Sequence, residues 1–284
     1  MKIAITGVTG FVGRHVARAL AQRDVECVHV VRKRRDGIEP PENGTVVEVD
    51  VHSPPADAFD RLGRPDVLLH LAWGGLPNYR SLHHYEEELP AQYRFLASLV
   101  RQGLPALVGV GTCFEYGMQS GELAEDLETR PDNPYGFAKD VLRAQLEQLR
   151  SETPFELTWA RLFYMYGEGQ SSRSLYTLVQ GAMRDGATTF PMSGGEQLRD
   201  FSPIETIAGH LAELAVAGEG LGIVNVCSGR PTSVRSLVEG WVADSGGELS
   251  LELGHYPYPD YEPMAFWGSA ARLEAFLAKR TSSS

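Results

Sequence analysis

Apolar, β-branched runs alternate with segments of helical period along the first 165 residues. Strands are expected at 2–6, 27–31, 45–50, 66–72, 106–112 and 155–162, and helices at 11–23, 84–103 and 134–152. Strands that alternate with helices form βαβ units, in which a parallel sheet is covered on both faces. Right-handed crossovers then give an α/β fold with a doubly wound parallel sheet of the Rossmann type. Pro90 indicates a kink or a late start in the second of these helices.

The pattern loosens after about Gly167, where Gly, Ser and Pro become frequent. Helices are expected at about 173–185, 205–217 and 233–244, a strand at 222–226, and a proline-rich loop at 255–263. We therefore expect a dinucleotide-binding domain over residues 1–165, which also receives about 200–228. Residues 166–199 and 229–284 are expected to form a smaller C-terminal substrate-binding lobe.

Composition and charge narrow the class of protein. The 284 residues are 43% hydrophobic and 22% charged, which is ordinary for a soluble globular chain. A net charge of −11 argues against nucleic acid and anionic membranes as partners. Apolar runs stay shorter than a membrane span and the N-terminus lacks the features of a signal peptide, so we expect a cytoplasmic protein. Three separate cysteines, Cys27, Cys113 and Cys227, suit a reducing compartment and form no metal-binding pattern.

The stretch TGVTGFVG (6–13) joins the first expected strand to the first expected helix. Gly7 permits a tight turn, Gly10 lets the backbone approach a pyrophosphate, and Gly13 lets the helix pack closely on the sheet. The helix N-terminus offers free N–H groups and a partial positive charge to the phosphates. Glycines also make plain turns, but this position between a strand and an amphipathic helix predicts a dinucleotide-binding loop.

The end of the second strand bears on the choice of cofactor. NAD-specific sites usually place an acid there, on the ribose 2′-hydroxyl. Here Arg32, Lys33, Arg34 and Arg35 occupy that place, and Asp36 follows too late to be the ribose ligand. Because a guanidinium suits a 2′-phosphate, NADP(H) is favoured, NAD(H) is the alternative, and Arg32 is the expected contact. The competing interpretation is a solvated basic loop.

Seven motifs occur in an order that resembles the extended short-chain dehydrogenases/reductases, the NAD-dependent epimerase/dehydratase family that acts on nucleotide sugars. The motifs are TGVTGFVG (6–13), HLAW (70–73), GTCFEYG (111–117), YGFAK (135–139), RLFYMYGEGQ (161–170), RDFSPIETIA (199–208) and NVCSGRPTSVRSLV (225–238). The resemblance covers nearly the whole chain. It implies a Rossmann-type enzyme with a nucleotide-sugar substrate, and a homodimer formed through the helices at 84–103 and 134–152.

By this resemblance, Tyr135 is the general acid/base, Lys139 lowers its pKa and holds the nicotinamide ribose, and Thr112 holds the substrate oxygen. Tyr135 and Lys139 share one helix face, although this spacing also arises by chance. Free tyrosine has a pKa of about 10, and a nearby ammonium favours the phenolate and brings that pKa down. Thr112 supplies a hydrogen-bond donor where charge develops on the carbonyl oxygen.

The resemblance implies further contacts, some with competing roles. Arg199 matches a contact to the nucleotide diphosphate, with a structural pair to Asp200 as its rival. Asp50 matches an adenine contact or is only a cap, and Trp73 either shapes the sugar pocket or belongs to the core. The expected cofactor contacts besides the glycines, Tyr135 and Lys139 are Phe11, Val12, Arg32, Asp50, Val51, Leu71, Ala72, Leu162 and Phe163, and the expected substrate contacts are Trp73, Thr112, Cys113, Phe114, Tyr164 and Arg199.

The residues after Thr112 bear on the reaction. Dehydratases similar to this chain usually carry an Asp–Glu pair there, whereas this chain has Cys113 and Phe114. No acid is available at those two places to protonate a leaving hydroxyl, so dehydration is disfavoured. Glu115, one position later, is expected to point the other way along an extended segment. For Cys113, a buried apolar role is preferred over a reactive thiol.

The region 83–92 departs from the family pattern. Glu88, Pro90 and Gln92 lie where the family often has an asparagine, which removes the basis for a relay through that residue. His83 and His84 have no other metal ligands near them in sequence. We expect them at a solvated helix start and not in a metal site.

The basic run at 32–35 favours a reductase, which consumes NADPH, over an epimerase with tightly held NAD. GTCFEYG (111–117) also resembles the motif of reductases that complete 6-deoxyhexoses such as 6-deoxytalose or fucose for surface polysaccharides. The expected function is NADPH-dependent reduction of the C4 keto group of a nucleotide-linked 4-keto-6-deoxyhexose, with dTDP favoured. The alternatives are an epimerase on the same scaffold and a non-catalytic dinucleotide-sensing protein, against which the intact triad argues.

Overall fold

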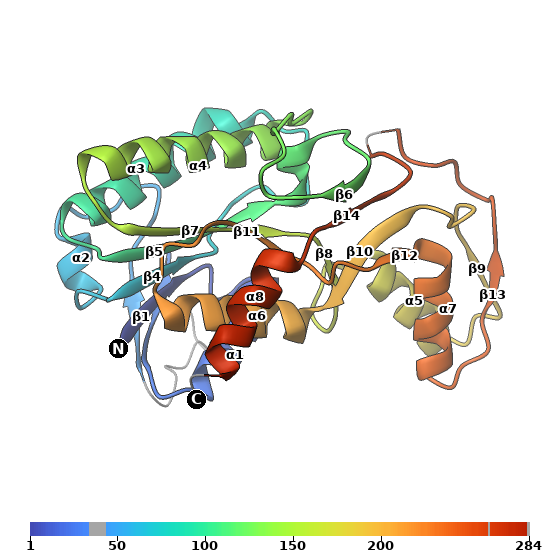
Figure 1. The fold of residues 1–284 in the computed structure, drawn as a ribbon. Helices are drawn as coiled ribbons and strands as arrows, with labels where there is room; N and C mark the ends of the chain where they lie inside the picture. The colour runs from blue at the N-terminus through green and yellow to red at the C-terminus, as the bar shows by residue number, and fades with distance from the viewer. Residues whose placement is uncertain (34–43, 261, 283–284) are drawn as a thin grey trace.

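The central sheet is the feature that positions everything else. A computed structural model describes residues 1–33, 44–260 and 262–282. Seven strands, each parallel to its neighbours, lie in the spatial order β11-β7-β5-β4-β1-β2-β3 (Figure 1). The chain moves outward from β1 to β3 and then returns to the other side of β1, which confirms the doubly wound α/β fold. The strands are β1 (Lys2–Thr6), β2 (Glu26–Val31), β3 (Gly44–Glu48), β4 (Val67–His70), β5 (Ala106–Thr112), β7 (Glu156–Leu162) and β11 (Gly222–Val226).

Helices cover both faces of this sheet, as Figure 1 shows. One face carries α1 (Phe11–Ala21), α6 (Ile204–Ala217) and α8 (Ala271–Thr281). The other face carries α2 (Ala58–Arg61), α3 (Leu89–Arg101) and α4 (Pro134–Glu152). Because both faces are buried, the central strands read as continuous apolar runs.

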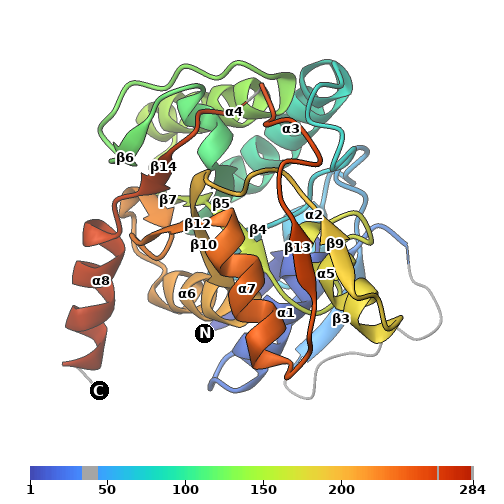
Figure 2. The same ribbon diagram turned by 90° about the vertical axis from the view of Figure 1, so that its right-hand side faces the viewer.

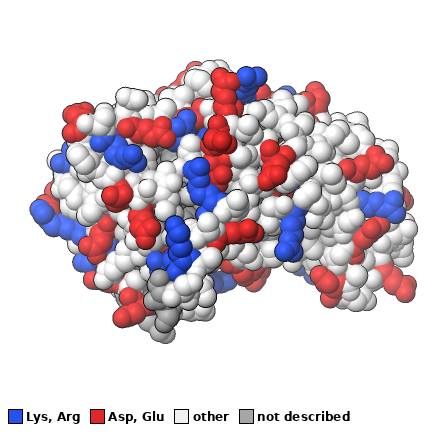
Figure 3. All heavy atoms as spheres, in the orientation of Figure 1, with Lys and Arg blue, Asp and Glu red and all other residues white. Residues whose placement is uncertain are grey.

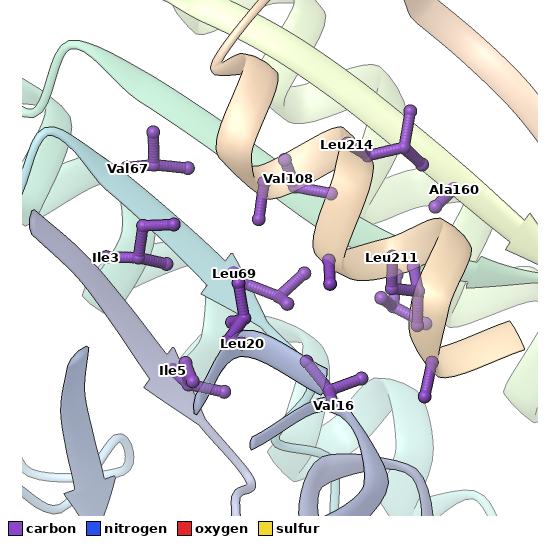
Figure 4. Close-up of a cluster of buried hydrophobic side chains, with 14 of the residues drawn as sticks. Ile3, Ile5, Val16, Leu20, Val67, Leu69, Val108, Ala160, Leu211 and Leu214 are labelled. Carbon is purple, nitrogen blue, oxygen red and sulfur yellow. The ribbon is translucent and has the colours of Figure 1, made fainter. Parts of the chain in front are cut away.

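Side chains that alternate along β1 divide the core into two clusters. Ile3 and Ile5 enter the cluster beneath α1 and α6, whereas Ala4 enters the cluster on the opposite face. This is the two-residue period of a strand. Each fully buried Ile, Leu or Val contributes about 1.5–3 kcal/mol relative to exposure. Figure 4 shows part of the first cluster, in which Ile3, Ile5, Val67, Leu69 and Val108 of the sheet face Val16, Leu20, Leu211 and Leu214 of the helices.

A smaller lobe of short elements extends from one end of the sheet (Figures 1 and 2). Its helices, α5 (Leu175–Arg184) and α7 (Val234–Asp244), share an apolar cluster that includes Val179, Phe190 and Trp241. The short strands pair as β8–β10–β12, β9–β13 and β6–β14. Their bounds are β6 (Gly121–Leu123), β8 (Tyr164–Tyr166), β9 (Thr189–Pro191), β10 (Leu198–Pro203), β12 (Pro231–Ser233), β13 (Ser250–Glu252) and β14 (Phe266–Gly268).

Two helices illustrate where the sequence pattern is informative. The helix expected at 134–152 is α4, and Pro90 lies in the first turn of α3, so this proline marks a late start after the π-helical turn η1 (His84–Glu88). The sequence pattern did not indicate α8. Its Leu273 and Phe276 pack in the cluster of the central sheet, although the sequence placed 229–284 in the C-terminal lobe. We propose that this lobe ends before α8.

Candidate active site

A cavity of about 550 Å³ lies at the carboxyl ends of β1, β2 and β4, where the strand order reverses. In open α/β sheets this is where ligands bind. Its wall combines the glycine loop, the end of β2, the segments after β3 and β4, and the side chains of Glu88 and Gln92. Of the residues expected at the cofactor, Gly7, Gly10, Arg32, Val51, Leu71 and Ala72 line this cavity.

The glycine loop has the geometry that a pyrophosphate requires. Gly7 has a φ of 71°, and a Cβ there would lie 2.7 Å from the Ala72 amide nitrogen. A Cβ on Gly13 would overlap the Gly7 carbonyl oxygen. Gly10 is the N-cap of α1, with extended backbone and no side-chain cap. The N–H groups of the first helical turn, which includes Phe11 and Val12, therefore remain for an anionic ligand, and the loop fits a dinucleotide.

The cavity wall at the end of β2 is basic. Arg32 and Lys33 line it, and the exposed Arg32 lies 3.8 Å from Asp50 Oδ1. Asp50 also accepts a hydrogen bond from the His52 N–H, which stabilises the turn after β3. Arg34, Arg35 and Asp36 lie outside the described residues. NADP(H) stays a prediction, in which Arg32 must exchange Asp50 for a 2′-phosphate.

The structure brings Tyr135 and Lys139 of α4 to the end of β5, where Thr112 lies. The Asn133 side chain caps α4 by accepting a hydrogen bond from the Gly136 N–H at 2.9 Å. Lys139 Nζ donates to the carbonyl oxygen of Val110 on β5 at 2.9 Å. All three side chains are more than 90% buried. The sheet and the helix cap thus hold the three proposed catalytic side chains in place.

Burial decides the protonation behaviour of this pair. It lowers the pKa of the Lys139 ammonium to about 7, with Glu115 and Glu88 opposing the change. It raises the pKa of the Tyr135 phenol above its usual value, and Tyr79 and Glu115 act in the same direction. The lowering of the Tyr135 pKa by Lys139 and a nicotinium charge stays a prediction, because in the free protein burial raises this pKa. Desolvation of the phenolate outweighs an ammonium that lies 5.9 Å from the ring centroid and already binds Val110.

Trp73 covers Lys139. The lysine Nζ lies 4.0 Å from the centroid of the indole, and the indole meets the Tyr135 ring edge to face at 6.0 Å. Trp73 Nε1 donates to His84 Nδ1 at 3.0 Å, and the other His84 ring nitrogen contacts the Asn78 carbonyl oxygen at 2.8 Å. Trp73 therefore lies at the cavity and against the triad. His84 is fully buried, so the expectation of a solvated helix start is wrong for this residue.

Glu115 occupies a different place from the one expected. Residues Cys113–Tyr116 form a 3₁₀ turn (η2) instead of an extended segment, and Thr112 and Glu115 form a reciprocal capping box at its start. Glu115 is fully buried, and Arg161 Nε donates to its carboxylate at 2.6 Å. The turn rotates Glu115 inward beneath β5, which an extended backbone would not do.

A second buried polar chain, which the sequence did not indicate, follows the cavity wall. Gln92 Nε2 donates to Glu88 at 2.7 Å, so the Gln92 oxygen is the partner of His70 Nε2 at 2.8 Å. His70 then carries its proton on Nε2 and accepts the Thr6 hydroxyl proton on Nδ1 at 2.9 Å. Burial and Lys139 lower the pKa of His70 to about 3. Glu88 and Gln92 thereby fix β4 against α3, at the place where the family often has an asparagine.

Comparison with known proteins identifies the relationship. The sequence profile of the NAD dependent epimerase/dehydratase family matches residues 3–227. The chain belongs to this family. The predicted resemblance to extended short-chain dehydrogenases/reductases is thereby confirmed.

Three individual matches show what this family member is similar to. It is 30% identical to a dTDP-6-deoxy-L-talose 4-dehydrogenase (NAD(+)) of Aggregatibacter actinomycetemcomitans, over 95% of this chain and 100% of the relative. It is 25% identical to a UDP-glucose 4-epimerase of Azospirillum brasilense, over 87% and 78% respectively. The structure of MoeE5 in complex with UDP-glucuronic acid and NAD matches with a TM-score of 0.81 and 23% identity, covering 98% of this chain and 93% of that one. These matches support an enzyme that modifies a nucleotide-linked sugar.

Arg199 of this family member has a partner that the sequence did not reveal. Its guanidinium donates to Glu262 at 3.0 Å and to the Leu198 and Met264 carbonyl oxygens. Asp200 instead accepts hydrogen bonds from Ser228 and Gly229, so the structural partner of Arg199 is Glu262 and not Asp200, the alternative considered from the sequence. Arg199 and Asp200 are consecutive residues of β10, so their side chains point to opposite sides of the strand.

Of the other expected substrate contacts, Cys113 and Phe114 lie in the turn η2 and Tyr164 lies in β8. Cys113 and Phe163 share a buried apolar cluster, and burial raises the pKa of the Cys113 thiol, in keeping with an apolar role. Phe114 meets the Tyr135 ring edge to face. The Tyr164 hydroxyl donates to Glu262, so that residue joins Tyr164 and Arg199. Leu162 and Phe163 lie at the end of β7.

Surface charge, helix length and metal-ligating side chains restrict the kinds of partner that the described residues can bind. Positive and negative side chains are interspersed on the face shown in Figure 3. Within the described ranges, no helix is long and apolar enough to cross a membrane. No group of three or more metal-ligating side chains occurs in that part of the chain, and His83 contacts Glu87 and Glu88 instead.

Proposed function

We propose that this enzyme reduces the C4 keto group of a nucleotide-linked 4-keto-6-deoxyhexose with NAD(P)H, and catalyses the reverse oxidation. The observation that carries the proposal is that Trp73, which lines the cavity that fits a dinucleotide, contacts both Tyr135 and Lys139, while Lys139 binds β5 two residues before Thr112. A dTDP-linked sugar is favoured, with 6-deoxytalose or fucose as product. The name of the 30% identical relative supports this substrate class.

The side chains of this chain supply proton transfer and orientation. A bound nicotinamide supplies or accepts the hydride at C4. Tyr135 donates its proton to the C4 oxygen as the carbonyl becomes a hydroxyl, while Thr112 holds the same oxygen through its hydroxyl. Lys139 supplies the positive charge that favours the phenolate left behind. Trp73 and Phe114 exclude water from the Tyr135 ring on two sides.

Dehydration lacks an acid in this site. Cys113 and Phe114 follow Thr112, and burial keeps the Cys113 thiol protonated by raising its pKa. Glu115 is the first carboxylate after them, and both of its oxygens contact N–H donors. A carboxylate held in this way is not free to protonate a leaving hydroxyl.

NADP(H) is our preferred cofactor, because Arg32 and Lys33 line the cavity at the end of β2. The competing assignment is NAD(H), which the names of the relative and of the solved structure carry. An epimerase with tightly held NAD is the second candidate function, and the UDP-glucose 4-epimerase match favours it.

The direct test follows absorbance of NADPH and NADH while the protein meets dTDP-, GDP- and CDP-linked 4-keto-6-deoxy sugars. We expect oxidation of the cofactor with one sugar, dTDP-linked before the others. No oxidation with any of them, together with copurified NAD, would transfer the assignment to the epimerase.

Tyr135→Phe tests the proposed acid. We expect kcat to fall by about 10²–10⁴-fold, because the hydroxyl proton is lost while the ring packing is kept. Cofactor affinity, measured by quenching of protein fluorescence, should stay within about twofold. Full activity of this variant would contradict the assignment.

A further inference from the structure

We infer that Glu115 is a positioning residue of this site: its buried carboxylate fixes Thr112 and supplies the negative charge that acts on Lys139 and Tyr135. The inference deepens the proposed function. It rests on that function for its kinetic readout only.

The carboxylate holds Thr112 through the backbone. Glu115 Oε1 accepts the Thr112 N–H at 2.9 Å, while the Thr112 side chain accepts the Phe114 N–H at 3.3 Å. The Thr112 side chain therefore starts the 3₁₀ turn that brings Glu115 back beneath it. A Cβ on Gly111 would overlap Glu115 Oε1, so the absence of a side chain at 111 leaves room for this arrangement.

The hydrogen-bond partners of Glu115 favour its ionised form, whereas its burial opposes it. Arg161 Nε and Trp159 Nε1 donate to the carboxylate in addition to Thr112 N–H. Every one of these groups is a hydrogen-bond donor, which a protonated carboxyl could satisfy only in part. Burial raises the pKa of Glu115, and the Arg161 guanidinium opposes that change at an Nε–Oε2 distance of 2.6 Å.

The Glu115 charge reaches both titrating members of the triad. It raises the pKa of Lys139 and of Tyr135. It is thus the largest charge that opposes desolvation of the Lys139 ammonium, ahead of Glu88. The other titratable groups that act on this pair are Glu88, His70 and His84 around Lys139, and Tyr79 and Cys113 around Tyr135.

Loss of the Glu115 charge should change the pH dependence of carbonyl reduction in one direction. Reduction needs Tyr135 protonated and Lys139 charged, so loss of either proton stops the reaction on the alkaline side. Glu115→Gln removes the negative charge that raises both pKa values. The alkaline limb of kcat/KM should therefore move to lower pH.

The first measurement needs no substrate. The chain has four lysines, Lys2, Lys33, Lys139 and Lys279, so ¹³Cε-lysine labelling gives a simple NMR spectrum in which Lys139→Met identifies the Lys139 signal. We expect the Lys139 titration midpoint at about 7 in the unmodified protein and at lower pH in Glu115→Gln. The matched control is Glu125→Gln, another buried carboxylate, which accepts the Asn225 N–H and should leave the midpoint unchanged.

A double variant guards against misfolding. Glu115→Gln with Arg161→Gln removes both buried charges, and the Lys139 midpoint should still fall because Arg161 is not among the groups that shift it. Unchanged midpoints in the single and double variants would overturn the inference whatever the substrate of the enzyme proves to be.

The kinetic measurement separates charge from position. Glu115→Asp keeps the charge but shortens the reach to the Thr112 N–H, so we expect kcat to fall about tenfold or more with the alkaline limb near its original pH. Glu115→Gln should lose kcat and shift the limb, with KM changed less than kcat in both variants. Loss of kcat with no shift of the limb in Glu115→Gln would reduce Glu115 to a structural residue.

Discussion

Two buried arginine–glutamate pairs serve the site in different ways. Arg161 and Glu115 lie beneath β5 with side chains that are 1% and 0% exposed, and their atoms approach to 2.6 Å. Arg199 and Glu262 join β10 to the segment before β14 at 3.0 Å, with side chains that are 4% and 13% exposed. The first pair joins β7 to the turn η2 that follows β5, and the second joins β10 to the segment before β14.

The difference teaches which pair can change partners. Glu115 accepts hydrogen bonds on both oxygens, and one of them holds the Thr112 N–H. Moving Glu115 would therefore break the hydrogen bonds that order the end of β5. Glu262 contacts Arg199 and Tyr164 and retains some solvent exposure. We therefore regard the pair beneath β5 as fixed. For the pair in the lobe, we predict that the diphosphate of a nucleotide sugar replaces Glu262 as a partner of Arg199.

Breaking the fixed pair should have the largest effect. Arg161→Met leaves Glu115 as an uncompensated buried charge, and we expect the free energy of unfolding to fall by about 3–5 kcal/mol. Urea denaturation measures this value. Arg161→Met combined with Glu115→Leu should recover only part of the loss, because no buried charge remains but the Thr112 N–H and Trp159 Nε1 lose their acceptor. A single variant within about 1 kcal/mol of the unmodified protein would show that the pair is not closed to water.

Breaking the exchangeable pair should affect binding more than folding. We expect Arg199→Met to raise KM for the nucleotide sugar by about 10–100-fold, the loss of a hydrogen bond to a charged group of about 1.5–3 kcal/mol. Glu262→Gln should lower KM, since a competing acceptor for the guanidinium is weakened. Steady-state kinetics measure both, with kcat as the internal control. Equal KM values in all three proteins would restrict Arg199 to a structural role.

The contrast between local and distant signals also explains what the sequence could predict. α4 follows from an apolar period, the cap at Asn133 and Pro134 in the first turn, all of them signals within a few residues. The glycine loop is similarly local. The turn at 113–116 was also readable, because Thr112-Cys-Phe-Glu115 is a capping-box pattern, S/T-x-x-E. The capping box was missed because residues 113–115 were expected to continue β5 as an extended segment.

Contacts between distant residues could not be predicted in this way. Arg199 and Glu262 lie 63 positions apart, and a neighbouring Asp200 offered a nearer but incorrect partner. His84 is buried against Trp73, 11 residues earlier, and Tyr135, 51 residues later, and neither contact is apparent from the neighbouring sequence. The direction of the shift in the Tyr135 pKa depends mainly on how deeply the phenol is buried. The four-residue spacing of Tyr135 and Lys139 along the helix does not indicate this depth.

The Lys139 ammonium, on which the Glu115 charge acts, should give the smallest effect, a change in the pH dependence of stability. Burial lowers the pKa of Lys139 from its unfolded value to about 7, so between pH 7 and the unfolded pKa the unfolded chain binds more protons. Stability contributed by this group therefore rises with pH in that window, by up to about 1.4 kcal/mol per pH unit. Urea unfolding of the unmodified protein and Lys139→Met at pH 7.5 and 8.5 isolates the effect. We expect the unmodified protein to gain about 1 kcal/mol relative to the variant over this interval. An equal change in both proteins would mean that Lys139 stays charged from pH 7.5 to 8.5. The charge of Glu115 and the contact with Trp73 would then offset the effect of burial on the Lys139 pKa.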